Sequence, residues 1–183
     1  AIFISLCAFS IALAASAGIT TLSVSANTQT VTGFDLANTT LSMTGAAVID
    51  VTGADATGTA DTLTIKQDVQ GNVSNTVTVG SAVEALHITL DDTGATANAA
   101  TMVLTNAEVG TLTVTEDAAT TTTGTTIALG TLNASVHTLD TSGVNGAQTV
   151  NMSASTVATT VSMSGDAIVT YTGGAKADNL TIS

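Results

Sequence analysis

The apolar positions of this chain alternate with threonine or serine over short stretches, and the same short phrase returns many times. The phrase Asp61-Thr62-Leu63-Thr64-Ile65 recurs almost unchanged as Asp178-Asn179-Leu180-Thr181-Ile182. Because successive residues of a β-strand face opposite sides, this alternation turns aliphatic side chains toward a core and threonines away from it. It therefore predicts a chain built largely of short β-strands.

The same pattern places a series of strands after residue 18, where no sustained helical period of apolar residues occurs. Gly, Asn and Asp residues separate them and predict turns. The predicted strands are Thr20–Ser25, Thr28–Phe34, Thr40–Thr44, Val48–Thr52, Thr62–Gln67, Thr76–Val79, Ala85–Leu90, Thr101–Thr105, Thr111–Thr115, Thr125–Leu129, Val136–Leu139, Thr149–Ser153, Thr159–Met163, Ile168–Thr172 and Asn179–Ile182.

Composition decides between two arrangements of these strands. Aromatic residues make up only 2% of the chain, and beyond residue 18 they are Phe34 and Tyr171 alone. A β-sandwich usually fills its core with bulkier side chains, whereas the thin core of a solenoid needs only medium aliphatics. The sequence therefore favours a β-solenoid, similar to a parallel β-helix, with an antiparallel β-sandwich as the alternative.

Residues 1–18 form a separate apolar N-terminal segment before a single β-rich repeat domain at 19–183. The segment carries no charged residue, and at about 17 apolar residues it lies at the short limit for a membrane span, so no stable span is expected. Three interpretations stay open. The segment is a helix in a filament core, a strand buried against a neighbouring subunit, or an apolar edge of the same β array.

The charge balance excludes one class of partner and favours one location. Lys66 and Lys176 are the only basic residues against 14 acids, which gives a net charge of −12. Nucleic-acid binding needs clustered basic residues, so that class is excluded. An acidic, threonine-rich surface suits a secreted or cell-surface protein. The single cysteine, Cys7, excludes an internal disulfide and is interpreted as a packing residue.

Several segments resemble RTX-type bacterial surface-layer proteins. The segment 173–181 (GGAKADNLT) resembles the RTX nonapeptide, although Lys176 stands where a glycine is expected. The segments 51–63, 83–88 and 136–143 resemble recurring phrases of these threonine-rich lattice proteins. The resemblance is one of style and extends from about Val48 to Ser183. It implies a secreted, self-assembling coat on a Gram-negative cell, often dependent on calcium.

Acidic residues in predicted turns are the candidate calcium ligands, because calcium prefers carboxylate and carbonyl oxygens. Asp91-Asp92 and Glu116-Asp117 are adjacent acids, which repel each other unless water or a cation separates them. Asp61 and Asp178 each precede a strand, where an aspartate often accepts hydrogen bonds from its own following backbone. The candidates are therefore Asp61, Asp91, Asp92, Glu116, Asp117 and Asp178, with solvated acids or turn capping as alternatives.

No catalytic arrangement is recognised in the sequence, so an enzyme is not expected. His87 and His137 are 50 residues apart and lack a neighbouring histidine or cysteine, so they are interpreted as outward-facing strand residues rather than zinc ligands. No GxSxG motif accompanies the many serines.

These observations predict an extracellular structural protein that assembles with copies of itself into a surface layer or filament. Open strand edges or the apolar N-terminus of one subunit would be covered by the next. One alternative is a binding module of a large adhesin that recognises a glycan such as cell-surface polysaccharide. Another is a pilin-like filament subunit with an apolar N-terminal helix in its core.

Overall fold

A computed structural model of the chain describes residues 2–4, 9–12, 21–24, 27–32, 40–44, 47–52, 62–68, 73–79, 83–91, 99–105, 109–117, 126–132, 134–165 and 167–183. These residues form strands and the loops that join them, and none of them is helical. Among them there is accordingly no helix of the length and hydrophobicity that a membrane span requires.

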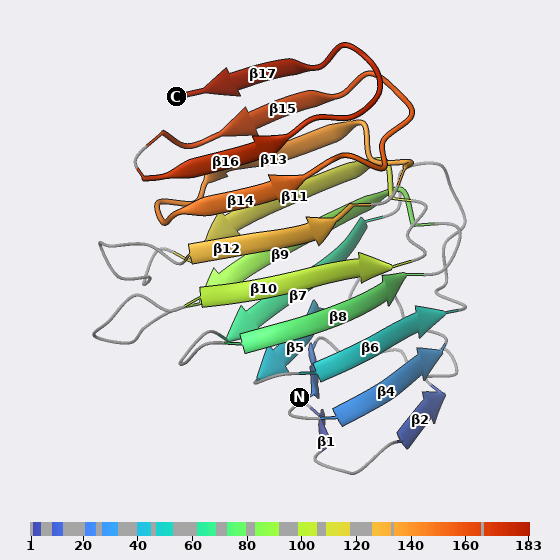
Figure 1. Cartoon of the computed structure of the whole chain (residues 1–183). Helices are drawn as coiled ribbons and strands as arrows, with labels where there is room; N and C mark the ends of the chain where they lie inside the picture. The colour runs from blue at the N-terminus through green and yellow to red at the C-terminus, as the bar shows by residue number, and fades with distance from the viewer. Residues whose placement is uncertain are drawn as a thin grey trace.

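The described strands form two sheets (Figure 1). Sheet A has nine strands, β1 (Ile2–Ile4), β3 (Thr21–Val24), β5 (Thr40–Thr44), β7 (Thr62–Asp68), β9 (Ala85–Asp91), β11 (Thr111–Glu116), β13 (Thr138–Gly143), β15 (Thr160–Met163) and β17 (Asn179–Ile182). Sheet B has eight strands within the same described ranges, β2 (Phe9–Ala12), β4 (Asn27–Thr32), β6 (Ala47–Thr52), β8 (Val73–Val79), β10 (Ala99–Thr105), β12 (Thr126–Thr131), β14 (Gln148–Asn151) and β16 (Val169–Thr172).

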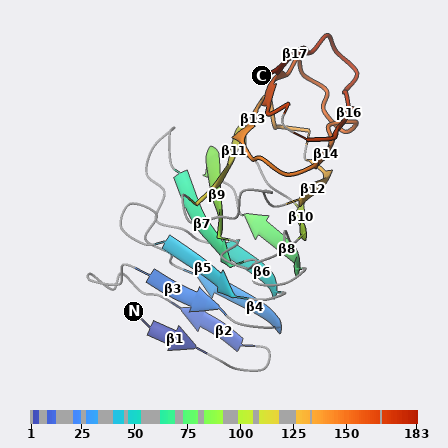
Figure 2. The same ribbon diagram turned by 90° about the vertical axis from the view of Figure 1, so that its left-hand side faces the viewer.

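The chain winds as a parallel β-solenoid, because consecutive strands alternate between the two sheets. Each strand pairs in parallel with the strand two places later, and the two sheets run in opposite directions (Figures 1 and 2). The solenoid prediction is confirmed. The antiparallel sandwich alternative is wrong, because all pairings between described strands are parallel. Every strand predicted from the sequence overlaps one strand of the structure.

The length of one coil varies along the solenoid. Thr160 pairs with Asn179, 19 residues later, whereas Val48 pairs with Thr76, 28 residues later. Strand pairing keeps the register of the alternating residues while the loops absorb the difference in length, since long surface loops cost little additional entropy. This variation explains why the sequence repeats only approximately.

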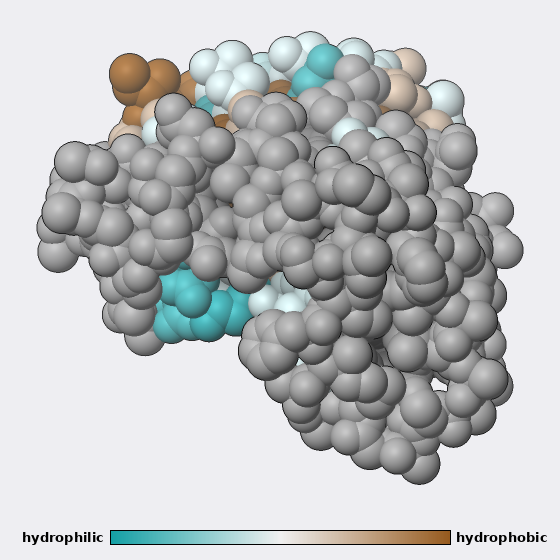
Figure 3. Space-filling view, turned by 90° about the horizontal axis from the view of Figure 1, so that it is seen from below, coloured by the Kyte–Doolittle hydropathy of each residue, from teal (hydrophilic) through white to brown (hydrophobic). Residues whose placement is uncertain are grey.

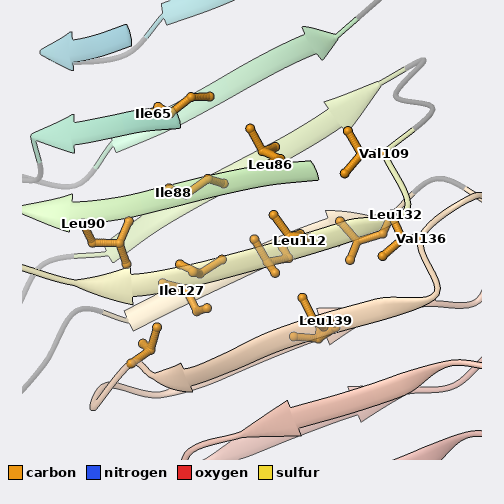
Figure 4. Packing of buried hydrophobic residues seen from close by; sticks show 14 of the residues in the cluster. Ile65, Leu86, Ile88, Leu90, Val109, Leu112, Ile127, Leu132, Val136 and Leu139 are labelled. Atoms are coloured by element: carbon orange, nitrogen blue, oxygen red, sulfur yellow. The ribbon is translucent and has the colours of Figure 1, made fainter. Parts of the chain in front are cut away.

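The core is a set of aliphatic columns between the sheets (Figure 4). Strand β9 alternates half-buried and buried residues along its whole length. On sheet A, inward-facing residues of successive coils align in one column, and each has an exposed fraction of at most 1%. This column contains Leu63, Leu86, Leu112, Leu139 and Val161. Ile127, Leu129 and Val150 are buried residues of the facing sheet.

Gln67, Thr141 and Gln148 are among the buried polar residues of the described part of the chain, and their side chains form hydrogen bonds there. Gln67 aligns with Met43 and Leu90, and its Nε2 donates to the Met43 carbonyl at 3.2 Å. Thr141 Oγ1 donates to Gln148 Oε1 at 2.5 Å, which links β13 to β14 across the core. Hydrogen bonding removes most of the cost of burying such groups. The alternation alone did not predict these inward polar side chains.

The apolar N-terminal segment contributes the first two described strands. β1 pairs in parallel with β3, and β2 pairs in parallel with β4. Ile2–Ile4 and Phe9–Ala12 are therefore strands, and the helical alternative for residues 1–18 is wrong at these positions. These strands extend the two sheets, as the interpretation of an apolar edge of the β array expects. Cys7 lies outside the described residues.

Shortening one of the buried side chains in this column should lower the free energy of unfolding substantially. We expect Leu112→Ala to lower the free energy of unfolding by about 2 to 5 kcal/mol, because it removes buried contacts with the coils on both sides and leaves a cavity. Thr113→Ala, on the outward face of the same strand, should cost less than about 1 kcal/mol. Urea unfolding followed by circular dichroism measures both. Equal costs would contradict the inward and outward assignment.

Candidate functional site

A lysine bridge joins three successive coils on the outer face of sheet A. Lys66 lies on β7 between the inward residues Ile65 and Gln67, so its side chain faces outward. Its Nζ lies 2.7 Å from Asp91 Oδ2 at the end of β9 and 3.1 Å from Asp117 Oδ2 just after β11. The structure therefore brings together one acid from each pair that the sequence singled out.

The backbone positions the second acid of this bridge. Asp117 N donates to the Leu90 carbonyl at 2.7 Å, which extends the ladder between β9 and β11 by one bond. This bond places the Asp117 carboxylate beside that of Asp91. Two carboxylates this close repel each other, so the ammonium of Lys66 supplies the compensating charge.

The two carboxylates raise the pKa of Lys66 above its ordinary value, first through the hydrogen bond to Asp91 and then through that to Asp117. The bridge is only partly shielded from water, because the side chains of Lys66, Asp91 and Asp117 are 42%, 21% and 33% exposed. Its contribution to stability is therefore modest. Asp91 Oδ1 is buried without a hydrogen-bond partner.

This geometry bears on the candidate calcium ligands. The position between Asp91 and Asp117 holds the Lys66 ammonium, and Glu116 Oε2 accepts a hydrogen bond from Asn145 Nδ2 at 2.9 Å. Asp61 and Asp92 lie outside the described residues. Over the part of the chain that the structure describes, no three His, Cys, Asp or Glu side chains gather in a way that could hold a metal ion.

Asp178 closes the last described coil by accepting four hydrogen bonds. Its Oδ1 accepts from Thr159 Oγ1 at 2.6 Å and from Thr159 N at 3.2 Å. Its Oδ2 accepts from the Tyr171 hydroxyl at 3.0 Å and from Gly174 N at 3.1 Å. We call this set of residues the Asp178 latch. It ties the start of β17 to the residue before β15 and to the end of β16.

The latch corrects one expectation and explains part of the RTX-like segment. The hydrogen bonds of Asp178 come from earlier residues rather than from its own following backbone. A Cβ on Gly173 would lie 2.7 Å from Asp178 Oδ2, and one on Gly174 would lie 2.8 Å from the Ser155 carbonyl oxygen. The glycine pair is therefore required for close approach at the latch.

Hydrogen bonds to the carboxylate lower the pKa of Asp178, with Thr159 the largest cause, opposed by partial burial. Burial is the first cause of the raised pKa of Tyr171, and the nearby Asp178 carboxylate adds to it. Near neutral pH, Asp178 is therefore ionised and Tyr171 is neutral.

Neither histidine is a member of these two groups. His87 is on β9, and its Nε2 lies 3.2 Å from Thr115 Oγ1 on the next coil. His137 is exposed just before β13, and its ring covers Gly110, where a Cβ would lie 2.5 Å from its Cε1 atom. Its position before the strand, rather than within it, is a small correction to the predicted strand Val136–Leu139.

Sequence reasoning missed the partners in both groups. Lys66 and Asp117 are 51 residues apart, and Thr159 and Asp178 are 19 residues apart. With coil lengths that vary, the sequence does not indicate which outward residues align. The one available signal was the scarcity of lysine, because each of the few cations on a strongly acidic chain is expected near acids.

Removing the lysine should make the bridge respond to calcium. We expect Lys66→Gln to destabilise the protein by about 0.5 to 1 kcal/mol, because Asp91 and Asp117 lose their shared cation. Added calcium should then raise the melting temperature of this variant more than that of the unchanged protein. Lys176→Gln removes the other lysine, which is exposed, and serves as the control. Identical calcium responses of both variants would refute this account of the bridge.

The Asp178 latch predicts a specific loss of stability in acid. Because the folded pKa of Asp178 lies below the ordinary value of 3.8, its contribution is complete above that pH and is lost as pH falls through the folded pKa. We expect Asp178→Asn to cost about 1 to 2 kcal/mol near neutral pH, and the variant should lose less further stability on acidification than the unchanged protein.

Tyrosine fluorescence measures this loss at the site itself, since Tyr171 is the single tyrosine and the chain has no tryptophan. Asp140→Asn is the control, because the Asp140 carboxylate accepts hydrogen bonds only from Ser142 among the described residues. A parallel acid dependence in the Asp178→Asn variant and the unchanged protein would show that another group controls it.

The chain was also compared with known proteins. No protein-family model, no curated protein sequence and no solved structure matches it.

Proposed function

We propose that this chain is an extracellular structural protein that assembles with copies of itself through the ends of its solenoid, forming a filament or a surface layer. The observation that carries the proposal is the distribution of charge, which leaves residues 1–34 and 167–183 without net charge. Where a copy of this chain leaves a strand unpaired, that strand is a template for pairing with another chain.

The core columns of sheet A continue into the last described strand, β17. Leu180 and Ile182 align with Val161 and Met163 of the previous coil. Leu180 is 40% exposed and Ile182 is 52% exposed, whereas both residues beneath them are 0% exposed. Figure 3 looks from below, toward the opposite, N-terminal end of the solenoid, so it does not face β17. Covering the edge with another strand would bury apolar area as each earlier coil does.

The distribution of charge favours contact through the ends over contact through the flanks. Residues 1–34 carry no charged side chain, and residues 167–183 carry Lys176 and Asp178, which sum to zero. The whole net charge of −12 therefore lies in residues 35–166. Flanks of two copies repel each other, whereas the ends meet without this penalty.

Calcium enters this proposal as a counter-ion between acidic flanks, since Lys66 already holds the position between Asp91 and Asp117. Divalent cations bridging carboxylates of neighbouring copies would allow filaments to associate side by side. The flat layer and the filament are then two states of one assembly. An acidic surface of this kind also supports the proposed location outside the cell.

Electron microscopy of the purified protein, with calcium and again after addition of a chelator, tests the proposal. We expect filaments in the chelator and laterally associated filaments or sheets with calcium. Raising the ionic strength without calcium should also favour lateral contact, because salt screens the repulsion between flanks. Monodisperse single molecules with calcium, with the chelator and at raised ionic strength would contradict the assembly proposal.

A further inference from the structure

The loop that joins β13 to β14 contains Asn145-Gly146, the only Asn-Gly dipeptide in the sequence. In such a dipeptide the backbone nitrogen of the glycine can attack the side-chain carbonyl carbon of the asparagine and close a succinimide ring. Glycine has no Cβ to obstruct this approach and leaves the backbone free to adopt the conformation it needs. Asn145 is therefore the asparagine at which this reaction is expected to be fastest.

The structure leaves both reacting groups of this dipeptide available. Asn145 is exposed and lies outside the strands. Within the described residues, the Gly146 N–H donates no hydrogen bond. Asn151 differs in this respect, because the next backbone nitrogen, that of Met152, donates to the Thr172 carbonyl at 2.8 Å. The nucleophile is thus held in the strand ladder after Asn151 and is not held after Asn145.

Asn145 also makes a contact that loss of its amide would reverse. Its Nδ2 donates to Glu116 Oε2 at 2.9 Å. Glu116 ends β11, which pairs with β13, so this hydrogen bond links the loop to the neighbouring coil. A carboxylate in place of the amide has no N–H to donate and brings a second negative charge to Glu116. Like charges at this distance repel each other.

The inner side of the same loop is held independently of Asn145. The buried Gln148 Nε2 donates to the Val144 carbonyl at 3.0 Å and to the Thr141 carbonyl at 3.3 Å. The reaction leaves these groups unchanged. A modified loop therefore keeps its buried anchor and loses its outer link to β11.

We propose that Asn145 is a site of spontaneous deamidation, at which the ageing protein exchanges a hydrogen bond between coils for repulsion from Glu116. The Gly146 nitrogen bonds to the Asn145 side-chain carbonyl carbon, and its proton leaves with the side-chain NH₂ as ammonia. Water then adds to either carbonyl of the succinimide and opens it to aspartate or isoaspartate, which ionises. Water is the only co-reactant. Each event adds one negative charge to residues 35–166, and the inference does not depend on self-association.

Timed incubation of the full chain tests the proposal. A mildly alkaline buffer is compared with a mildly acidic one, because the attack requires a deprotonated backbone nitrogen. Isoelectric focusing counts the acidic forms, and mass spectrometry of fragments cut after acidic residues locates the modified position. We expect one acidic form that accumulates faster in alkali and is modified at Asn145, while Asn151 remains an amide. Earlier modification of any other asparagine would overturn the proposal.

Two control variants establish the mechanism. Asn145→Gln keeps an amide at the position but must close a larger ring, so it should form the acidic product far more slowly. Gly146→Ala keeps Asn145 and obstructs the attack, and it should also slow the reaction. Because Gly146 is buried, Asn145→Gln decides the matter if the alanine variant does not fold. Equal rates in Asn145→Gln and the unchanged protein would overturn the assignment.

A third set of variants tests the consequence for the fold. Asn145→Asp carries the product charge from the start and should lower the melting temperature, with a smaller loss at high salt. Adding Glu116→Gln should recover most of this loss relative to Glu116→Gln alone, because the neutral amide no longer repels the new carboxylate. Equal melting temperatures of Asn145→Asp and the unchanged protein would refute the exchange of attraction for repulsion.

Discussion

Parallel pairing of each strand with the coils before and after it is the constraint on which this structure depends. A buried or half-buried strand must place its backbone N–H and C=O groups in hydrogen bonds, and in a solenoid only the neighbouring coils can supply them. Register follows from the same requirement, because a slip of one residue would turn Leu86 and Ile88 outward and the flanking polar residues into the core. Coil length is free to vary, and stability is shared between nearest neighbours.

The charged side chains of Lys66 and Asp178 link neighbouring coils and do not line a pocket. Lys66 neutralises two acids that lie on later coils, and Asp178 gathers donors from the previous coil and from its own loop. Both groups reach beyond a single strand pair, which suits a chain that lacks aromatic bulk and disulfides. Most of the acids nevertheless have no cation to pair with, since the chain has 2 lysines and 14 acids. Residues 35–166 therefore carry a strongly negative net charge.

The alternating pattern was sufficient to locate the strands and their inward residues, because period-two burial depends on local sequence. It was sufficient to favour the solenoid, since Val, Leu and Ile with few aromatics match a thin core. It could not predict which residues of successive coils align. It therefore missed the position of Lys66 between Asp91 and Asp117 and that of Thr159 beside Asp178. The inward polar side chains of Gln67 and Gln148 were missed for a related reason, because their partners come from other strands. The N-terminal strands were hidden by continuous apolar sequence, in which strand and helix look alike.

The first and last described coils differ in charge from the coils between them, because residues 1–34 carry no charged side chain and residues 167–183 carry one of each sign. Soluble repeat proteins usually protect such ends with polar capping units, and sheet edges are commonly protected by charged residues, lysine above all. Here the acids avoid residues 1–34, and Leu180 and Ile182 stay apolar at the open strand β17. Lys176 lies in the loop before β17 rather than on its edge. The net negative charge therefore lies on residues 35–166, away from the apolar strand β17.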